Sequence, residues 1–168
     1  MYIYFLINAA LLLFAYPLMF IIEKLFGFVS NVTLIEISNI NSELLRRLSQ
    51  EAPGTFQHSM QVGNLAADAA RNINANSLEV RTGALFHDIG KTLNPIYFTE
   101  NQSGGINPHD ELTPEKSAEI IIKHVTDGLS LADKYHLPRS IKNFIATHHG
   151  LSKTGYFYIT YKNQHNGE

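Results

Sequence analysis

The segment from Tyr2 to Ile22 carries no charged side chain, and this feature limits the possible folds of the chain more than any other. At a rise of about 1.5 Å per residue, a helix of this length spans about 30 Å, the thickness of the hydrocarbon core of a bilayer. We therefore predict a transmembrane helix within residues 1–26, in contact with the lipid bilayer through residues 2–22.

Two other interpretations compete with a membrane helix. A signal peptide is disfavoured because the stretch has no basic region before it, is too long for the apolar part of a signal and ends without a small-residue cleavage site. A buried core helix stays open, since Asn8 and Pro17 interrupt the apolar run. Lys24, Arg46 and Arg47 follow the stretch and no Lys or Arg precedes it, so the positive-inside rule predicts that everything after residue 23 is cytoplasmic.

Composition narrows the class of protein further. The chain has 168 residues, of which 45% are hydrophobic and 17% are charged, which fits one domain of ordinary size plus one extra element. A net charge of −2 supplies no general basic field, so we expect no DNA or RNA polymer as a partner. Without cysteine there is neither a disulfide nor a thiolate ligand, and any metal must be held by nitrogen and oxygen.

Helical patterns dominate the first half of the chain after residue 40. Residues 27–41 are mixed and β-branched, which is typical of a connector, and residues 42–48 resemble one or two helical turns. Apolar residues at three-to-four spacing predict an amphipathic helix over about residues 55–73. The next helix is expected over about residues 78–89, with Gly90 as a left-handed stop.

Two more helices are predicted in the second half. Residues 94–112 are rich in Asn, Gly and Pro and are too long for an idle connection, so this loop is expected to cover or line a site. Thr113 as N-cap and Pro114 at the first position begin one helix. Pro138 begins another, which ends at Gly150. With no convincing strand pattern, we expect an all-α fold.

Groups that can bind a metal recur on four of these helices, around the adjacent pair His87-Asp88. Each has a structural alternative when taken singly, such as a hydrogen-bonded core histidine or a solvated histidine at a helix end. Burying all of them without a cation would cost several kcal/mol in desolvation and repulsion, whereas one cation satisfies several at once. We therefore predict a site for a divalent transition metal, such as manganese or iron, with these ligands: His58, His87, Asp88, His124, His148 and His149.

Several motifs occur in a fixed order: Leu44-Leu45-Arg46-Arg47-Leu48, Glu51-Ala52-Pro53-Gly54-Thr55 before His58-Ser59, His87-Asp88-Ile89-Gly90-Lys91, Glu100-Asn101-Gln102, Asn107-Pro108-His109-Asp110, His124-Val125 with Asp127-Gly128, and Thr147-His148-His149-Gly150. This ordered set resembles the cytosolic module of the bacterial seven-transmembrane HD hydrolases, which are membrane-bound cyclic di-AMP phosphodiesterases. The resemblance runs to about Gly150 and begins at the apolar segment, which looks like the last of the seven membrane helices.

The resemblance implies a fold, a location and an activity. Residues 42–168 would form an HD-domain helical bundle on the cytoplasmic side of the bacterial inner membrane. The bundle would hydrolyse cyclic di-AMP to linear pApA with two divalent metal ions. His58, His87 and Asp88 would hold one metal together with a later aspartate, while Asp88 bridges to a second metal held by His124, His148 and His149. Two such metals can activate a water between them and stabilise the charge that builds on a phosphodiester.

Three further roles are expected beside the metal ligands. Asp88 and Lys91 would be catalytic, with Lys91 neutralising a phosphate oxygen. The structural alternative for Lys91 is a solvated lysine at a helix end. His109 and Asp110 would contact substrate along with Lys91, or else cap their loop.

The chain departs from the family pattern after Gly150, where it has no aspartate and only one carboxylate side chain, Glu168. We therefore expect an HD domain that is truncated at its C-terminus. Two alternatives to hydrolysis of cyclic di-AMP follow: an impaired module that binds cyclic dinucleotide or a partner, and another HD activity, either cyclic di-GMP phosphodiesterase or nucleotidase. Both of these other HD activities are disfavoured. The Gly-Tyr-Pro motif expected of the cyclic di-GMP class is absent, and a mononuclear nucleotidase has little use for His124, His148 and His149. Self-association into a homo-oligomer stays open.

Overall fold

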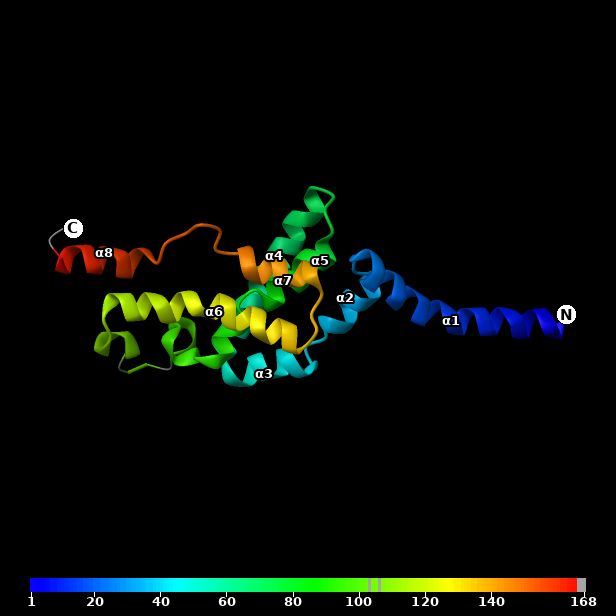
Figure 1. Cartoon of the computed structure of the whole chain (residues 1–168), viewed down its shortest axis with the longest axis horizontal. Coiled ribbons are helices and arrows are strands. Elements are labelled where there is room, and N and C mark those ends of the chain that lie inside the picture. Colours follow the sequence, from blue (N-terminus) through cyan, green and yellow to red (C-terminus); the bar gives the residue numbers. More distant parts are fainter. Residues whose placement is uncertain (103, 106, 166–168) are drawn as a thin grey trace.

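The computed structural model describes residues 1–102, 104–105 and 107–165, and no β-strand occurs in these ranges (Figure 1). Its α-helices, in chain order, are α1 (Tyr2–Phe26), α2 (Asn31–Ile37), α3 (Glu43–Glu51), α4 (Pro53–Asn72), α5 (Ser77–Phe86), α6 (Pro114–Lys134), α7 (Arg139–Thr147) and α8 (Gly155–Gln164). Four short 3₁₀ helices connect α5 to α6: η1 (Ile89–Leu93), η2 (Pro95–Tyr97), η3 (Thr99–Asn101) and η4 (Pro108–Glu111). The predicted all-α fold is confirmed. Glu168 lies outside the described residues.

Helix α1 extends away from the other helices as a single rod (Figure 1). It is long and apolar enough to cross a membrane by length and composition, and its most apolar stretch buries nothing against the rest of the protein. Gly27 ends the helix in the left-handed conformation, with φ of 72°. The Glu23 carboxylate then accepts hydrogen bonds from the Ser30 amide and the Thr33 hydroxyl, which joins the end of α1 to the start of α2.

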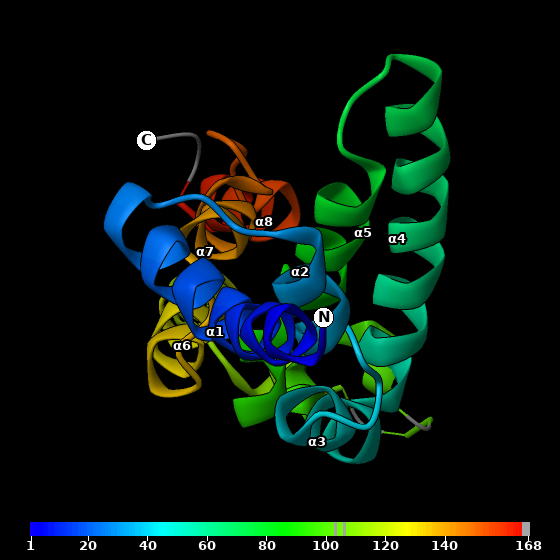
Figure 2. The ribbon, with the colours of Figure 1, turned by 90° about the vertical axis from the view of Figure 1, so that its right-hand side faces the viewer.

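The segment predicted as a connector contains α2, whose Leu34 side chain is completely buried. Leu34 belongs to the same hydrophobic cluster as the residues of α3 and α5, and α2 packs on α5. The view along α1 in Figure 2 shows α2 between α4 and α5 on one side and α6 and α7 on the other. Residues 31–37 therefore pack as part of the helical bundle.

The hydrophobic core joins helices that are distant in sequence. Each large apolar side chain that is fully removed from water contributes about 1.5–3 kcal/mol. The core includes Leu45 and Leu48 of α3, Leu85 and Phe86 of α5, Ile89 of η1, Leu131 of α6, and Ile141 and Ile145 of α7. Because these residues lie next to the end of α5, the middle of α6 and the end of α7, their packing brings those three places together.

The prediction that Gly90 stops a helix by adopting a left-handed conformation is wrong. Helix α5 ends at Phe86, and Gly90 lies inside η1 without a positive φ. A Cβ atom at Gly90 would overlap the carbonyl oxygen of His124 and lie 2.5 Å from the amide nitrogen of Gly128. Glycine is needed here because η1 and α6 approach each other at backbone distance.

The helix start predicted at Thr113 and Pro114 is confirmed, whereas the helix predicted to end at Gly150 ends at Thr147. The Thr113 hydroxyl accepts a hydrogen bond from the Lys116 amide at 3.3 Å, which caps α6. Gly150 has φ of 56° just after α7. Helix α8 was not predicted, because Gly155–Gln164 shows no clear apolar stripe; it packs along α6 (Figure 1).

Candidate metal centre

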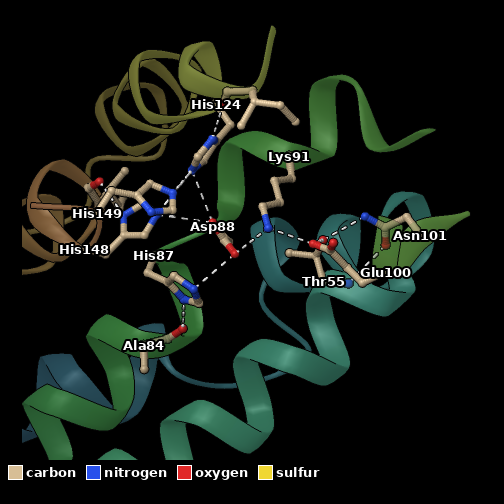
Figure 3. A network of polar contacts seen from close by, with 12 residues as sticks. Thr55, Ala84, His87, Asp88, Lys91, Glu100, Asn101, His124, His148 and His149 are labelled. Carbon is tan, nitrogen blue, oxygen red and sulfur yellow. Dashed lines mark hydrogen bonds and ion pairs between the residues drawn. The ribbon is translucent and has the colours of Figure 1, made fainter. Parts of the chain in front are cut away.

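The five predicted histidine ligands lie around the sixth ligand, Asp88. Figure 3 shows Asp88 with His87, His124, His148 and His149. His58 comes from α4, His87 and Asp88 from the junction of α5 and η1, His124 from α6, and His148 and His149 from the end of α7. They form two groups that share Asp88, and within each group the possible ligand atoms lie within 4.8 Å of one another. The His124 cluster consists of Asp88, His124, His148 and His149, and the His58 cluster consists of His58, His87 and Asp88.

Asp88 faces the two clusters with different oxygens. Its Oδ1 lies 3.3 Å from Nε2 of His124 and 3.4 Å from Nε2 of His148, while its Oδ2 lies 3.1 Å from Nε2 of His87. The residue is only 3% exposed. Among the residues that the structure describes, no donor reaches the buried Oδ1 with hydrogen-bond geometry. A buried carboxylate oxygen that faces imidazole nitrogens without such a bond fits a cation ligand.

Three of the histidines are held in the orientation that metal binding needs. In each, Nδ1 lies within hydrogen-bond distance of the backbone carbonyl three residues earlier: Ala84 for His87 at 2.7 Å, Ile121 for His124 at 2.5 Å, and Ile145 for His148 at 2.9 Å. A carbonyl can only accept, so each Nδ1 carries a proton and each ring directs its Nε2 toward the cluster. Metal-binding histidines are usually oriented in this way.

The Nε2 atoms of the His124 cluster face one another. Nε2 of His124 lies 3.2 Å from Nε2 of His148 and 3.2 Å from Nε2 of His149. Two unprotonated nitrogens at this distance repel, whereas a shared cation would attract both. Burial, followed by the charges of His148 and His124, lowers the pKa of His149, which favours its neutral, metal-binding form. The residues present therefore fit a divalent metal bound through nitrogen and oxygen.

The bridging position carries a negative charge. Burial acts to raise the pKa of Asp88, but the surrounding imidazoles of His124, His148 and His87 outweigh it and hold that pKa well below its usual range. For His87, burial acts to lower the pKa, and the adjacent Asp88 carboxylate raises it overall. The site thus combines an ionised carboxylate with imidazoles on both of its sides.

Lys91 is part of the same network, one turn beyond Asp88. Its Nζ donates to Asp88 Oδ2 at 2.8 Å and to Glu100 Oε1 at 2.7 Å. The Thr55 hydroxyl also donates to Glu100 Oε1, at 3.0 Å. Burial lowers the pKa of Lys91, but Asp88 and Glu100 raise it overall, so the ammonium is charged. Glu100 and Thr55 stand in the sequence motifs without a predicted role, because no local pattern pairs residues so far apart.

A cavity of about 460 Å³ opens over both clusters. Its polar wall is formed by His58, His87, Asp88, Lys91, His148 and His149, and its apolar wall by Val62, Ala66, Val80, Ala84 and Phe144. A ligand with a charged part and a flat apolar part would contact both walls.

His109 and Asp110 lie elsewhere. They line a second cavity of about 490 Å³ beside α6 and α8, and none of the six predicted metal ligands lines it. The His109 ring contacts Phe157 of α8 at a centroid distance of 5.0 Å, and its Nε2 donates to the Tyr97 carbonyl at 2.9 Å. Asp110 accepts a hydrogen bond from Asn107. The structure therefore brings Lys91 to the clusters and does not bring His109 or Asp110 there.

The helical bundle and this His/Asp centre define the class of protein. The HD domain model matches residues 55–166, so the chain belongs to the HD domain family. Its His/Asp cluster is able to hold a metal.

The chain is also similar in sequence and in structure to individual proteins with an HD domain. The chain is 49% identical to the cyclic-di-AMP phosphodiesterase PgpH of Listeria monocytogenes over 140 residues, which covers 83% of this chain and 20% of that protein. It is 44% identical to PgpH of Bacillus subtilis over 146 residues, with 87% and 20% covered. The crystal structure of the L. monocytogenes PgpH HD domain in complex with cyclic-di-AMP matches with a TM-score of 0.74 and 48% identity, covering 78% of this chain and 61% of that one. The predicted resemblance is confirmed, and the chain spans about a fifth of the length of the curated relatives it matches.

Proposed function

We propose that this chain is the catalytic HD domain of a metal-dependent phosphodiesterase that hydrolyses cyclic di-AMP to linear pApA. One observation carries the proposal: two donor clusters share the buried Asp88 carboxylate inside a single cavity. The similarity to PgpH supports cyclic di-AMP as the substrate.

The two clusters would hold two divalent cations, with manganese or iron favoured by the nitrogen and oxygen donors. When bound, such a pair supplies Lewis acidity to the phosphodiester and activates a water nucleophile. The chain contributes fixed geometry, because carbonyl bonds orient the rings of His87, His124 and His148. Asp88 contributes the negative charge that both cations need.

Substrate would be held by both walls of the cavity. The Lys91 ammonium lies at the polar wall beside Asp88, where it can neutralise a phosphate oxygen as negative charge builds. In the same cavity, Val62 and Phe144 offer an apolar surface against which a purine ring can pack. His109 and Asp110 are not part of this proposed substrate site, because they line the other cavity.

We also propose that α1 anchors the domain in the bacterial inner membrane with the HD bundle on the cytoplasmic side. The support is the apolar surface of α1, which is exposed along its length, and the basic residue Lys24 at its C-terminal end. In this arrangement, residues 1–26 are the membrane helix and residues 42–168 the HD domain, and residues 27–41 connect them through α2, which packs on the bundle. Extraction of membranes with alkaline carbonate tests the anchor: the chain should stay with the lipid, and release into the wash would contradict it.

The activity is tested by incubating the whole chain in detergent with cyclic di-AMP and Mn²⁺ and separating the products by chromatography. We expect linear pApA, slower turnover of cyclic di-GMP, and no product from Asp88→Asn. Glu119→Gln is the matched control, because Glu119 forms an exposed ion pair with Lys116, away from both clusters. Faster turnover of cyclic di-GMP, or no product from a folded and metal-loaded chain, would contradict the proposal.

A second candidate is a module that binds cyclic dinucleotide without hydrolysing it. Among the described residues, the His58 cluster offers three donor residues and the His124 cluster offers four. A cation held by fewer donors would bind more weakly, and hydrolysis with two metals needs both cations. Saturable binding of cyclic di-AMP with no linear product in the same assay would favour this candidate over the first.

A further inference from the structure

We infer that Glu100 sets the affinity of the His58 cluster for its cation by balancing the charge of Lys91. The inference rests on the proposed metal-dependent function and assigns to Glu100, which lies outside both clusters, control over one of the two metal positions. The Lys91 ammonium would repel a cation in the His58 cluster, and the Glu100 carboxylate would reduce that repulsion.

Asp88 Oδ2 has two close neighbours, an imidazole nitrogen and an ammonium group. It is the oxygen nearest His87 Nε2, at 3.1 Å, so it is the oxygen that Asp88 offers to the His58 cluster. The Lys91 ammonium lies 2.8 Å from the same oxygen. A cation held by His58, His87 and Asp88 would therefore have a lysine charge as its close neighbour, and the two would repel. The His124 cluster uses Oδ1, which makes no ion pair with Lys91.

Burial makes this repulsion strong. The side chains of Lys91 and Asp88 are 14% and 4% exposed, so little water screens them. Glu100 is the carboxylate on the other side of the ammonium, at 2.7 Å. It offsets the lysine charge and gives Lys91 a partner away from Asp88 (Figure 3).

Glu100 is held in place by the start of α4. Thr55 donates its hydroxyl hydrogen to Glu100 and its backbone N–H to Asn101 Oδ1 at 3.0 Å, and the Asn101 amide donates to the Thr55 hydroxyl at 2.8 Å. Gly54 lets η3 lie directly on α4, because a Cβ atom there would overlap the Glu100 carbonyl. These contacts keep a carboxylate beside Lys91, on the side that faces away from Asp88.

Titration of the whole chain in detergent with Mn²⁺ alone, by calorimetry and electron paramagnetic resonance, tests the inference without any nucleotide. Glu100→Gln should weaken the more weakly bound Mn²⁺ about 10-fold, the lower end of the loss typical for a direct partner of a metal ligand, because Glu100 acts through Lys91. The tighter Mn²⁺, assigned to the His124 cluster, should change less than about threefold, and the signal of a spin-coupled Mn²⁺ pair should decrease. Glu119→Gln, which removes an exposed Lys–Glu pair of the same kind, should leave both affinities unchanged.

Lys91→Met provides an independent variant. Removal of the ammonium should strengthen the weaker Mn²⁺ site, and adding Glu100→Gln to Lys91→Met should then have no further effect, because Glu100 acts through the lysine charge. Equal Mn²⁺ binding by the unaltered chain and Glu100→Gln, or an undiminished effect of Glu100→Gln in the Lys91→Met background, would overturn the inference. If the unaltered chain takes up one Mn²⁺ only, gain of a second in Lys91→Met supports the inference and no gain overturns it. Failure to cleave cyclic di-AMP would count against the proposed function and would leave these metal affinities unaffected.

Discussion

Asp88 is the residue on which both donor clusters depend, because its two oxygens face different imidazoles from a nearly completely buried position. Asparagine has almost the same shape but cannot supply the anion that two cations would share. Loss of an outer partner alone typically costs 10- to 100-fold in metal affinity, so loss of the shared ligand should cost more.

We expect Asp88→Asn to lose both metals together, with affinities weakened by more than about 100-fold and hydrolysis of cyclic di-AMP abolished. Metal content by mass spectrometry and product formation are the measurements. Asp133→Asn is the control, since Asp133 pairs with Lys142 on the surface. Retention of two metals per chain in Asp88→Asn would refute the bridging role.

Glu100 gives a prediction about pH in the metal-free chain. Burial acts to raise the pKa of Glu100, but the hydrogen bond from Lys91 outweighs it and lowers the pKa overall. A lowered pKa in the folded state means that the ion pair stabilises the fold above about pH 4.3, the usual value for glutamate, and that this contribution is lost as pH falls through the lower folded-state pKa.

In the presence of a metal chelator, the difference in thermal midpoint between the unaltered chain and Glu100→Gln should therefore be largest near neutral pH. It should shrink progressively as pH falls from about 4.3 through the lower folded-state pKa, and below that pKa both chains carry an uncharged side chain at residue 100. Thermal melts followed by circular dichroism from pH 3 to 7 measure it. A difference that stays constant over this range would show that the Lys91–Glu100 ion pair does not stabilise the fold.

At the scale of elements, the close approach of η1 to α6 aligns the two clusters. Asp88 immediately precedes η1, and Gly90 lies against the backbone of His124 and Gly128. Any side chain at Gly90 must push η1 away from α6 and so separate Asp88 from His124.

We expect Gly90→Ala to destabilise the fold by about 3 kcal/mol, the upper part of the range for overpacking, and to weaken metal binding even where the protein stays folded. Gly155→Ala is the matched control: no atom lies within 4 Å of the added Cβ, so its effect should stay within about 0.5 kcal/mol. Urea unfolding with and without Mn²⁺ separates the two effects. Equal stability of the two variants would mean that η1 can shift without cost.

At the scale of the whole molecule, the apolar helix and the bundle meet at few places. The buried core cluster begins at Leu34, and the described contact between the end of α1 and α2 is made by Glu23 with Ser30 and Thr33. The bundle thus has its own core without the side chains of α1.

A chain lacking residues 1–26 should therefore keep a cooperative thermal transition and the same Mn²⁺ stoichiometry. It should also stop partitioning into the detergent phase of a Triton X-114 separation, because the exposed apolar surface of α1 is gone. Loss of the cooperative transition would mean that α1 stabilises the bundle through more than the Glu23 contacts.

Much of the fold could be predicted because its signals are local. The helix start at Thr113 depends on residues within one turn, and three-to-four spacing predicted a helix over residues 55–73. The same spacing gave the wrong buried face of α4, because Leu65 and Ile73 are exposed and the small residues Ser59, Gly63 and Ala67 are buried instead. Helix α8 has no clear apolar stripe and was not predicted. Gly90 was predicted as a left-handed helix stop, but glycine is needed there because η1 and α6 approach each other closely.

The sequence by itself determined which groups could bind a metal, on which helices they lie, and that no cysteine takes part, because residue chemistry and helical periodicity are local properties. Only the tertiary structure decided that Asp88 divides its oxygens between two clusters, that Lys91 is paired with Glu100, and that His109 lies in another cavity. These relations join side chains from segments that are not neighbours in sequence. Their distances follow from how α4, η1, η3, α6 and α7 pack around the shared core, which no local pattern encodes.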